Sequence, residues 1–225
     1  MQNAAVIPSL IFDLDGTLVD SLPGIAHSLN RALEIHHLPQ HSMPDVRGFV
    51  GDGLNMLVKR ALPEDAREGL LEIVVAEFKK DYALSWSEGT RPYAAIPLVL
   101  KELQRGGYPL AVLSNKTHEF TRTITREVFP LIHFTLVLGQ QPGVPNKPNP
   151  AGAYKIASAM GCAPENCILI GDSTADIETA ANAGMQSIAV TWGYHDRPKL
   201  IASGATVFAD NPADLPRLIQ TMVVE

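Results

Sequence analysis

The sequence predicts an α/β fold, a Rossmann-like, doubly wound parallel sheet into which a small all-α domain is inserted. From residue 92 onwards, short apolar segments alternate with amphipathic helical segments, which is typical of a parallel sheet covered by helices on both faces. One more strand segment lies near the N-terminus, roughly a hundred residues before the second strand, and a crossover connection needs far fewer. The interval between them shows helical patterns and no strand pattern, so we expect an insertion there.

The core strands are expected where apolar and β-branched residues cluster between turn residues. In chain order they cover residues 6–12, 109–113, 134–138, 167–170, 187–190 and 205–208. The core helices are expected where apolar residues recur three and four positions apart. They cover residues 94–105, 117–128, 151–160, 174–183 and 212–221. Strand and helix therefore alternate along the core with short connections.

The inserted segment is predicted to contain four helices. The first begins near Pro23, because proline is favoured in a first helical turn and apolar residues follow it at helical spacing for about four turns. The other three cover residues 44–50, 54–62 and 64–84. We therefore expect the chain to divide into an α/β core of residues 1–16 and 89–225 and a small helical domain of residues 17–88.

The composition excludes several classes of protein. The chain has 225 residues, of which 46% are hydrophobic and 19% charged, as in ordinary globular proteins. Its net charge is −6 and no stretch is rich in Lys or Arg, so we expect no nucleic-acid partner and no anionic membrane surface. No apolar run approaches the roughly 20 residues of a membrane span, and a cytoplasmic location is expected. Nothing in the sequence indicates an oligomeric state.

Two carboxylates follow the first predicted strand. Asp13 and Asp15 are separated by one residue, and Gly16 and Thr17 come directly after them. Residues i and i+2 of an extended chain point to the same side, so the two carboxylates would repel each other unless a cation joins them. Mg²⁺ prefers oxygen ligands and typically uses one or two carboxylates beside a phosphate, so this segment favours phosphate chemistry. The alternative is that these residues only form a turn.

The next two strand ends carry groups that suit an anion. Ligands of open parallel sheets bind beyond the carboxyl ends of the strands. Ser114, Asn115 and Lys116 follow the second strand and offer a hydroxyl, an amide and the N-terminus of a helix, which attracts phosphate. They could equally form a plain helix N-cap. Lys147 lies in a proline-rich loop after the third strand, where restricted backbone could aim its ammonium at a phosphate and a carboxylate.

The fourth predicted strand also ends in carboxylates. Ser173 and Asp176 have the spacing of a capping box, which gives Asp176 a structural explanation. Asp172 is left without one. Because it emerges beside the predicted position of Asp13 and Asp15, it is a natural ligand of the same metal ion. Asp176 could cap the helix and also bond to metal-bound water.

Taken together and in this order, the four segments resemble the motifs of the haloacid dehalogenase superfamily of phosphotransferases. The resemblance covers nearly the whole chain, and the four motifs together are highly specific. The helical insertion after the first motif resembles the cap of the subclass that contains phosphoglycolate phosphatases, β-phosphoglucomutases and the dehalogenases themselves. The resemblance therefore implies the same α/β core and an enzyme that acts on a small phosphorylated metabolite.

The resemblance also implies a Mg²⁺-dependent mechanism and a role for each motif. Asp13 would attack phosphorus to form an aspartyl-phosphate, while Asp15 would protonate the leaving oxygen and then activate water. Mg²⁺ would be held by Asp13, Asp172 and the backbone carbonyl of Asp15, with Asp176 in the second shell of ligands. The phosphoryl oxygens would be held by Thr17, Ser114, Asn115 and Lys147.

Further details resemble the phosphoglycolate phosphatase branch, namely residues 50–54, 59–62, 114–116 and 191–194. Related pyrophosphatases and sugar-phosphate phosphatases contain similar stretches, and a β-phosphoglucomutase would share the aspartyl-phosphate, so these activities remain alternatives. A dehalogenase is disfavoured because its chemistry has no use for a proton donor at Asp15. The residues expected to determine substrate specificity are Arg47, Gly51, Asp52, Gly53 and Lys116. Of these, Arg47 or Lys116 would receive a substrate carboxylate.

Overall fold

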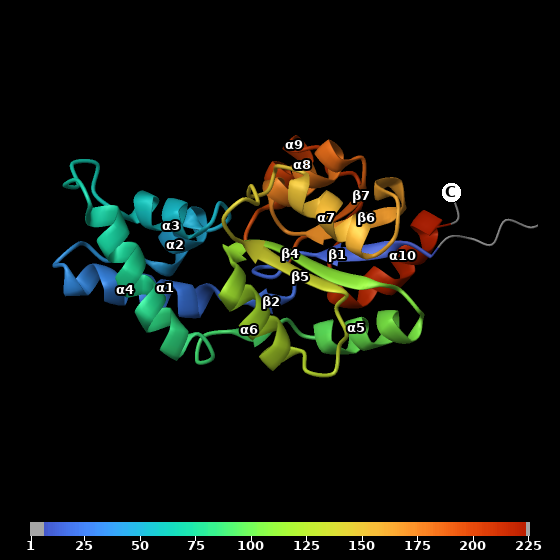
Figure 1. Ribbon diagram of the computed structural model, residues 1–225, viewed down its shortest axis with the longest axis horizontal. Coiled ribbons are helices and arrows are strands. Elements are labelled where there is room, and N and C mark those ends of the chain that lie inside the picture. The colour runs from blue at the N-terminus through green and yellow to red at the C-terminus, as the bar shows by residue number, and fades with distance from the viewer. Residues whose placement is uncertain (1–6, 224–225) are drawn as a thin grey trace, which may run out of the picture.

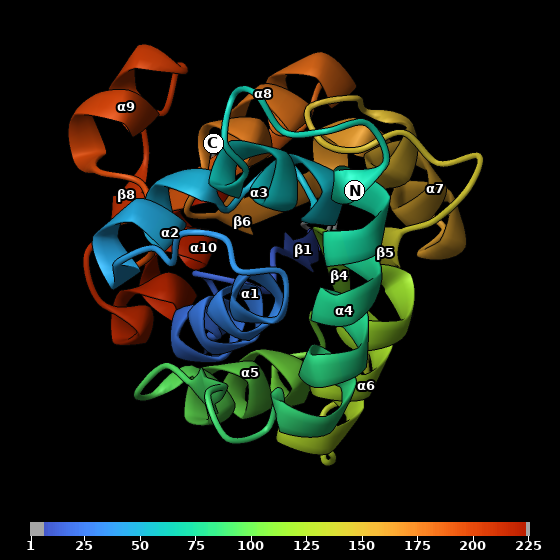
Figure 2. The same cartoon turned by 90° about the vertical axis from the view of Figure 1, so that its left-hand side faces the viewer.

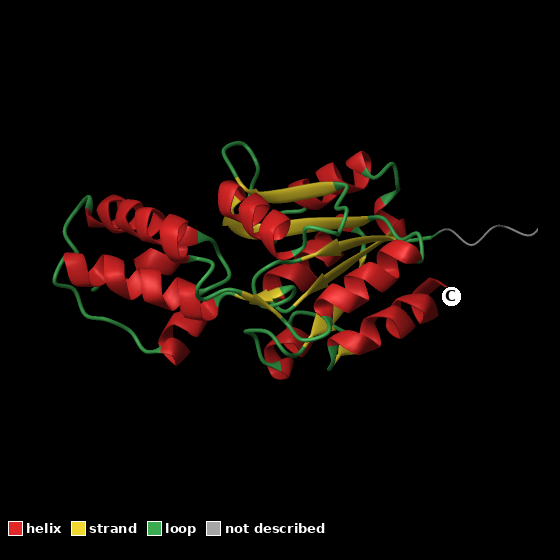
Figure 3. Ribbon diagram, turned by 90° about the horizontal axis from the view of Figure 1, so that it is seen from below, coloured by secondary structure: helices red, strands yellow, loops and turns green. Residues whose placement is uncertain are grey.

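The computed structural model describes residues 7–223, which form a parallel sheet covered by helices on both faces and a group of inserted helices beside it (Figure 1, Figure 3). The predicted fold class is confirmed. The strands lie in the order β5 (Leu136–Gln140), β4 (Leu110–Thr117), β1 (Ser9–Phe12), β6 (Cys167–Gly171), β7 (Gln186–Val190) and β8 (Phe208–Ala209). Residue 6, expected in the first strand, lies outside the described residues.

The central strand β1 brings the ends of β4 and β6 together. It pairs in parallel with both neighbours, and Phe12 lies opposite Val112 on one side and Ile170 on the other. The chain leaves β1 towards β4 and β5, then returns to the opposite side of β1 for β6, β7 and β8. The strand order therefore reverses at β1, and the crevice beyond such a reversal is where ligands of open α/β sheets bind.

The core helices are α5 (Ile96–Arg105), α6 (His118–Val128), α7 (Ala151–Ala159), α8 (Thr174–Ala183), α9 (Arg197–Ala202) and α10 (Leu215–Val223), with short 3₁₀ helices at Pro164–Asn166 and Pro212–Asp214. Alternate residues of β1 face opposite layers, as the pleat requires. Phe12 belongs to the buried cluster that includes residues of α5 and α10, whereas Ile11 belongs to the cluster of α7 and α8. No helix within residues 7–223 is both long and apolar enough to cross a lipid bilayer.

Strand β4 is longer than predicted. The sequence predicts that it ends at residue 113 and that Ser114 to Lys116 lead into a helix, but the strand continues to Thr117 and α6 begins at His118. The neighbouring strand β5 stays paired with it, since Thr117 lies opposite Gln140 after an irregularity in the register. Lys116 therefore lies on a strand and not in the first turn of a helix.

The inserted segment forms α1 (Leu22–Ile35), α2 (Met43–Phe49), α3 (Leu54–Ala61) and α4 (Leu70–Ser85). We call these four the inserted helices. They lie beyond the ends of the strands, in front of β1 and β4 in Figure 2. The last was expected from residue 64 but begins only at Leu70, because Gly69 has a left-handed backbone conformation (φ +78°) that a helix cannot contain.

A small antiparallel ribbon connects the inserted helices with the core. Its strands are β2 (Val19–Asp20) and β3 (Arg91–Pro92). The expectation that residues 17–88 contain no strand is therefore wrong for β2, since two residues are too few to show an alternating pattern. The division of the chain into domains at residues 16 and 89 stays a prediction.

Candidate active site

The pairing of β1 with β6 brings Asp13 and Asp172 together. Asp13 is the first residue after β1, and its backbone N–H still donates to the Ile170 carbonyl of β6 at 2.9 Å. Asp172 is the first residue after β6. Both side chains are buried, with residue exposures of 7% and 1%. Two carboxylates thus emerge side by side from the centre of the sheet.

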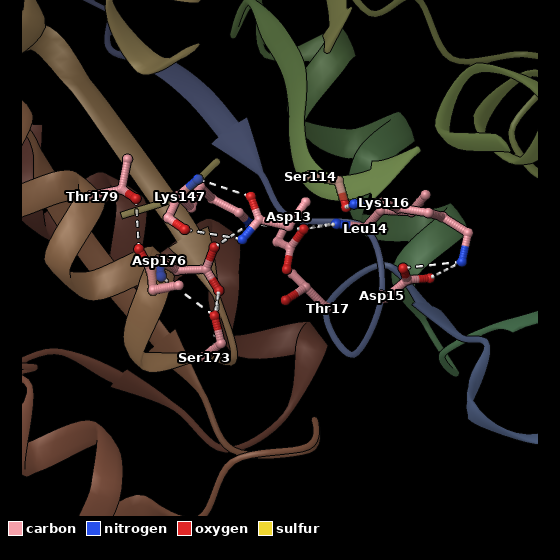
Figure 4. Close-up of polar contacts among 12 residues, drawn as sticks. Asp13, Leu14, Asp15, Thr17, Ser114, Lys116, Lys147, Ser173, Asp176 and Thr179 are labelled. Atoms are coloured by element: carbon pink, nitrogen blue, oxygen red, sulfur yellow. Dashed lines mark hydrogen bonds and ion pairs between the residues drawn. The ribbon is translucent and has the colours of Figure 1, made fainter. Parts of the chain in front are cut away.

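Asp176 completes a buried acidic cluster. Oxygen atoms of Asp13, Asp172 and Asp176 all lie within 4.8 Å of one another. The Lys147 ammonium bridges two of them, at 2.9 Å from Oδ1 of Asp13 and 2.6 Å from Oδ1 of Asp176 (Figure 4). The other Asp176 oxygen accepts from the N–H and hydroxyl of Ser173 at the start of α8, so Asp176 also forms the expected capping box.

The acidic cluster contains more negative charge than Lys147 can neutralise. Burial is the largest effect and raises the pKa of Asp13 to about 7, although Lys147 opposes it. Burial and the neighbouring Asp13 and Asp176 carboxylates raise the pKa of Asp172 to about 8. Hard oxygen donors in a buried site with too little positive charge fit a divalent cation such as Mg²⁺. Asp13, Asp172 and Asp176 all lie close enough together to hold it, whereas the sequence predicts Asp176 only as a partner of metal-bound water.

Two glycines let the backbone approach Asp172 closely. A Cβ atom on Gly193 would lie 2.3 Å from the Asp172 Cβ, and one on Gly16 would lie 2.3 Å from its Oδ2. The Asp172 carboxylate also accepts from the Thr17 hydroxyl at 2.8 Å and from the Tyr194 N–H at 2.7 Å. These contacts fix its orientation towards the acidic cluster, as in metal sites whose ligands are held by outer hydrogen bonds.

The carboxylate of Asp15 does not join the acidic cluster. The sequence predicts that Asp13 and Asp15 point to the same side, but β1 ends at Phe12 and the chain turns at Gly16, which has a positive φ of +83°. The strand rule therefore no longer applies to Asp15. Its carboxylate accepts from Ser21 and lies 3.1 Å from the Lys116 ammonium, on the other side of the turn from Asp13 (Figure 4). A metal contact through the Asp15 carbonyl stays a prediction.

All four predicted phosphate-binding residues already have partners within the chain, and those of Lys147 are Asp13 and Asp176. The Thr17 hydroxyl bonds to Asp172, as described above. The Asn115 amide donates to the carbonyls of Gly51 and Lys147, at 2.9 and 3.1 Å, and its oxygen accepts from the Lys147 N–H at 2.8 Å. It therefore positions the backbone of Lys147. Ser114 has a buried hydroxyl that accepts from the Lys116 N–H at 3.3 Å.

A cavity extends from the acidic cluster towards the inserted helices. Asp13, Asp15, Ser114, Lys116 and Asp172 line it from the core. The wall formed by α1, α3, α4 and α6 is largely apolar and consists of Ile25, Leu54, Leu57, Phe78, Tyr82 and Phe120. The cavity thus joins a strongly charged end to an apolar end, as in sites that recognise a phosphate and a small attached group.

The predicted specificity residues lie in different places. Gly51 and Gly53 line the cavity, between Asn115 and the apolar wall. Asp52 forms an ion pair with Arg60. Arg47 donates to the Tyr194 carbonyl at 2.7 Å and the Gly193 carbonyl at 2.9 Å, so its guanidinium connects α2 with the core. Among the described residues 7–223, neither Arg47 nor Asp52 is part of the cavity wall.

Sequence reasoning did not place three further side chains at this site. Ser21 bonds to Asp15 and precedes α1, where a serine is expected only as an N-cap. The Tyr194 hydroxyl accepts from the Ser21 N–H at 3.1 Å. Tyr82 lies on the buried face of α4, where an aromatic residue is typical of a helix core. Only Tyr194 had a sequence signal, since it belongs to the segment 191–194 that resembles a known family motif.

Comparison with known proteins identifies a family with similar sequences. The family model described as haloacid dehalogenase-like hydrolase matches residues 10–190. A phosphoglycolate phosphatase from Aquifex aeolicus is 32% identical over 216 residues, which cover 96% of this chain and 98% of the relative. Another from Pectobacterium atrosepticum is 31% identical over 225 residues, 97% of this chain and 95% of the relative.

Solved structures have the same fold. A candidate phosphoglycolate phosphatase from Lactobacillus delbrueckii subsp. bulgaricus superposes with a TM-score of 0.88 at 31% identity, covering 95% of this chain and 98% of that one. A haloacid dehalogenase-like hydrolase from Streptococcus pneumoniae gives a TM-score of 0.84 at 25% identity, covering 94% and 97%. Nearly the whole chain therefore has counterparts of similar structure.

Proposed function

The chain belongs to the haloacid dehalogenase-like hydrolase family, and from this we propose that it is a Mg²⁺-dependent phosphatase that hydrolyses 2-phosphoglycolate through an aspartyl-phosphate on Asp13. One observation carries the proposal. Asp13 lines the cavity while its carboxylate lies 2.9 Å from the Lys147 ammonium and within 4.8 Å of the other members of the acidic cluster. A nucleophile, a counter-ion for phosphate and the ligands of a divalent ion thus meet at one end of the cavity.

The charges around Asp13 suit attack on phosphorus. A phosphate dianion repels a carboxylate nucleophile, and the buried Lys147 ammonium reduces this repulsion because it lies 2.9 Å from the Asp13 carboxylate. A divalent ion held by Asp13, Asp172 and Asp176 would add charge stabilisation of the phosphoryl oxygens. Asn115 holds the backbone of Lys147, and Asp13 and Asp176 hold its ammonium before the substrate binds.

Asp15 is suited to proton transfer because it lies outside the acidic cluster. Its carboxylate lines the cavity and is oriented by Ser21 and Lys116. We assign it protonation of the leaving oxygen and then deprotonation of the water that cleaves the aspartyl-phosphate. Two carboxylates with different surroundings thereby perform different tasks, a division that acid–base enzymes commonly use.

The choice of 2-phosphoglycolate is supported by relatives that carry this activity in their names and match almost the full length of the chain. The test is the release of inorganic phosphate from 2-phosphoglycolate, pyrophosphate, sugar phosphates and p-nitrophenyl phosphate, with Mg²⁺ and with EDTA. We expect Mg²⁺-dependent release and the highest kcat/KM for 2-phosphoglycolate, and none with Asp13→Asn. A higher kcat/KM for another ester would reject the substrate, and isomerised sugar phosphate would indicate a mutase.

A further inference from the structure

The Tyr82 hydroxyl is a buried polar group in the wall of the cavity. Tyr82 belongs to α4, is fully buried and lines the cavity. Within residues 7–223 its O–H donates to no acceptor. Leaving a buried hydroxyl unpaired is costly, and most buried hydroxyls in proteins are paired. An unpaired one in a cavity wall indicates that a bound molecule supplies the partner.

Lys116 places a positive charge beside the Tyr82 ring. Its ammonium lies 4.7 Å from the centre of the Tyr82 ring, and its side chain is only 7% exposed. Burial lowers the pKa of Lys116, but the Asp15 carboxylate and Tyr82 outweigh burial and raise it above its ordinary value. The ammonium therefore stays charged while it faces the cavity.

The rest of this wall offers no second positive charge. Among the residues of the described range 7–223 that line the cavity, Lys116 is the only lysine or arginine. Its neighbours in the wall include Leu57, Phe78 and Phe120. An anion that enters this apolar end is attracted strongly to Lys116, because charges interact more strongly where water is excluded. Arg47 does not compete, since it donates to two backbone carbonyls outside the cavity wall.

The position of Lys116 next to Asp15 sets the distance between the carboxylate subsite and the leaving oxygen of the substrate. Lys116 lies 3.1 Å from both Asp15 oxygens, and Asp15 is the residue to which we assign the leaving oxygen. In a 2-phosphocarboxylate a single carbon separates the leaving oxygen from the carboxylate. When the leaving oxygen lies against Asp15, the carboxylate therefore lies within reach of Lys116. An ammonium has three N–H donors and can hold Asp15 and a second carboxylate together.

We propose that Lys116 and Tyr82 form a subsite for the carboxylate of a short 2-phosphocarboxylate substrate. Lys116 supplies the ion pair and the Tyr82 hydroxyl donates one hydrogen bond. This inference rests on the proposed function, because it assigns the group that lies beyond the leaving oxygen. In this subsite α4 takes part in substrate recognition, since Tyr82 comes from an inserted helix and Lys116 from a core strand.

The test compares two substrates of nearly equal size. Ethyl phosphate has a methyl group where 2-phosphoglycolate has its carboxylate, so the ratio of their kcat/KM values isolates recognition of the carboxylate. Tyr82→Phe keeps the ring and removes only the hydroxyl. We expect it to lower the ratio by roughly 10-fold or more, mainly through KM for 2-phosphoglycolate, because a site built to pair a polar group discriminates by its hydrogen bonds.

Lys116 variants test the charge. Lys116→Met should lower the ratio by roughly 100-fold, because it removes the ion pair as well as its hydrogen bonds. It also frees Asp15, so kcat for ethyl phosphate is expected to fall too, and the ratio is the decisive quantity. Lys116→Arg keeps the charge and should recover part of the ratio. If Lys116→Met does not fold, Tyr82→Phe and Lys116→Arg still test the inference.

Matched controls lie on α7, away from the cavity. The Tyr154 hydroxyl donates to the Asn182 carbonyl, and Lys155 is exposed. Tyr154→Phe and Lys155→Met should leave the ratio unchanged.

Each possible failure has a different meaning. If the Tyr82 and Lys116 variants lower kcat/KM for both substrates by the same factor, the subsite is rejected and the proposed function stands. If the unmodified protein hydrolyses ethyl phosphate and 2-phosphoglycolate equally well with Mg²⁺, the subsite and the substrate are rejected, but the phosphatase is not. If it hydrolyses neither substrate nor p-nitrophenyl phosphate, the proposed function fails, and the subsite with it.

Discussion

The Lys147 ammonium lies 2.9 Å from Oδ1 of Asp13, and both side chains are buried at the end of the central strand. The same ammonium lies 2.6 Å from Asp176. It is therefore placed to hold the proposed nucleophile and a phosphate. Within the described residues 7–223, it is the positive charge that pairs with the acidic cluster. The first prediction follows from this arrangement.

Replacing Lys147 by Met should reduce kcat by roughly 100- to 1,000-fold, the range found when one charge-stabilising donor is removed from an active site. Stability should fall as well, by roughly 3–5 kcal/mol, because removing one partner of a buried ion pair leaves uncompensated charge. Steady-state kinetics and denaturant unfolding in EDTA measure the two effects. Lys155→Met, at an exposed position, is the control, and equal kcat values for the two variants would contradict the role of Lys147.

The metal-free protein should lose stability as the pH rises. The folded-state pKa of Asp172 is raised from 3.8 to about 8, so between those values the folded protein binds more protons than the unfolded chain. The free energy of unfolding therefore falls with increasing pH across this window. In EDTA, Asp172→Asn should gain stability relative to the unmodified protein as the pH rises from about 4 to about 8, the interval between the unfolded and folded pKa values of Asp172.

Unfolding curves of both proteins at several pH values give this difference directly. Added Mg²⁺ should stabilise the unmodified protein most at the upper end of the window, where its carboxylates are ionised, and Asp172→Asn much less. A stability difference that does not change with pH would show that burial does not raise the pKa of Asp172.

Gly193→Ala should weaken Mg²⁺ binding and activity together. Its new Cβ would lie 2.3 Å from the Asp172 Cβ, so Asp172 or the backbone at residue 193 must shift and the arrangement of the acidic cluster is disturbed. Gly48 is the matched control, because a Cβ there meets nothing within 4 Å and the residue lies inside α2. Gly48→Ala should keep full activity and add about 0.5–1 kcal/mol of stability. The Mg²⁺ concentration that gives half-maximal activity should rise for Gly193→Ala and stay unchanged for Gly48→Ala. An unchanged value for Gly193→Ala would count against the metal site.

Arg47→Met should impair turnover of all phosphate esters to the same degree. The Arg47 guanidinium holds the carbonyls of Gly193 and Tyr194, so its loss loosens the contact between α2 and the core near Asp172. KM should rise by similar factors for 2-phosphoglycolate and ethyl phosphate. A larger rise in KM for 2-phosphoglycolate would contradict this prediction and would indicate that Arg47 binds the substrate carboxylate.

Much of the fold could be predicted because it depends on local patterns. The helix expected at residues 174–183 is α8 with those bounds, since a capping box starts it and Gly184 in a left-handed conformation ends it. The closeness of Asp13 and Asp172 follows from the same reasoning, because both residues come directly after apolar strands and neighbouring parallel strands end at the same edge of the sheet.

Other features of the site depend on contacts between distant segments. The direction of the Asp15 side chain is set by a turn at Gly16 and by Ser21 and Lys116, none of which a strand pattern reveals. Tyr82 becomes a cavity residue only because α4 packs over the end of β4, and a helix pattern shows only that one of its faces is buried. Sequence reasoning therefore located the acidic residues together with Lys116, Gly51 and Gly53, but not the apolar wall of the cavity.

The central claim is that Asp13 carries the phosphoryl group during turnover. The most direct measurement is rapid acid quenching of the protein with Mg²⁺ and 2-phosphoglycolate, followed by mass spectrometry of the peptide that contains Asp13. We expect a phosphoryl group on Asp13 within the first turnover, and none on that peptide from Asp13→Asn or from the Mg²⁺-free protein. Full turnover with Asp13 unmodified throughout, or Asp13→Asn with undiminished phosphate release, would contradict the account.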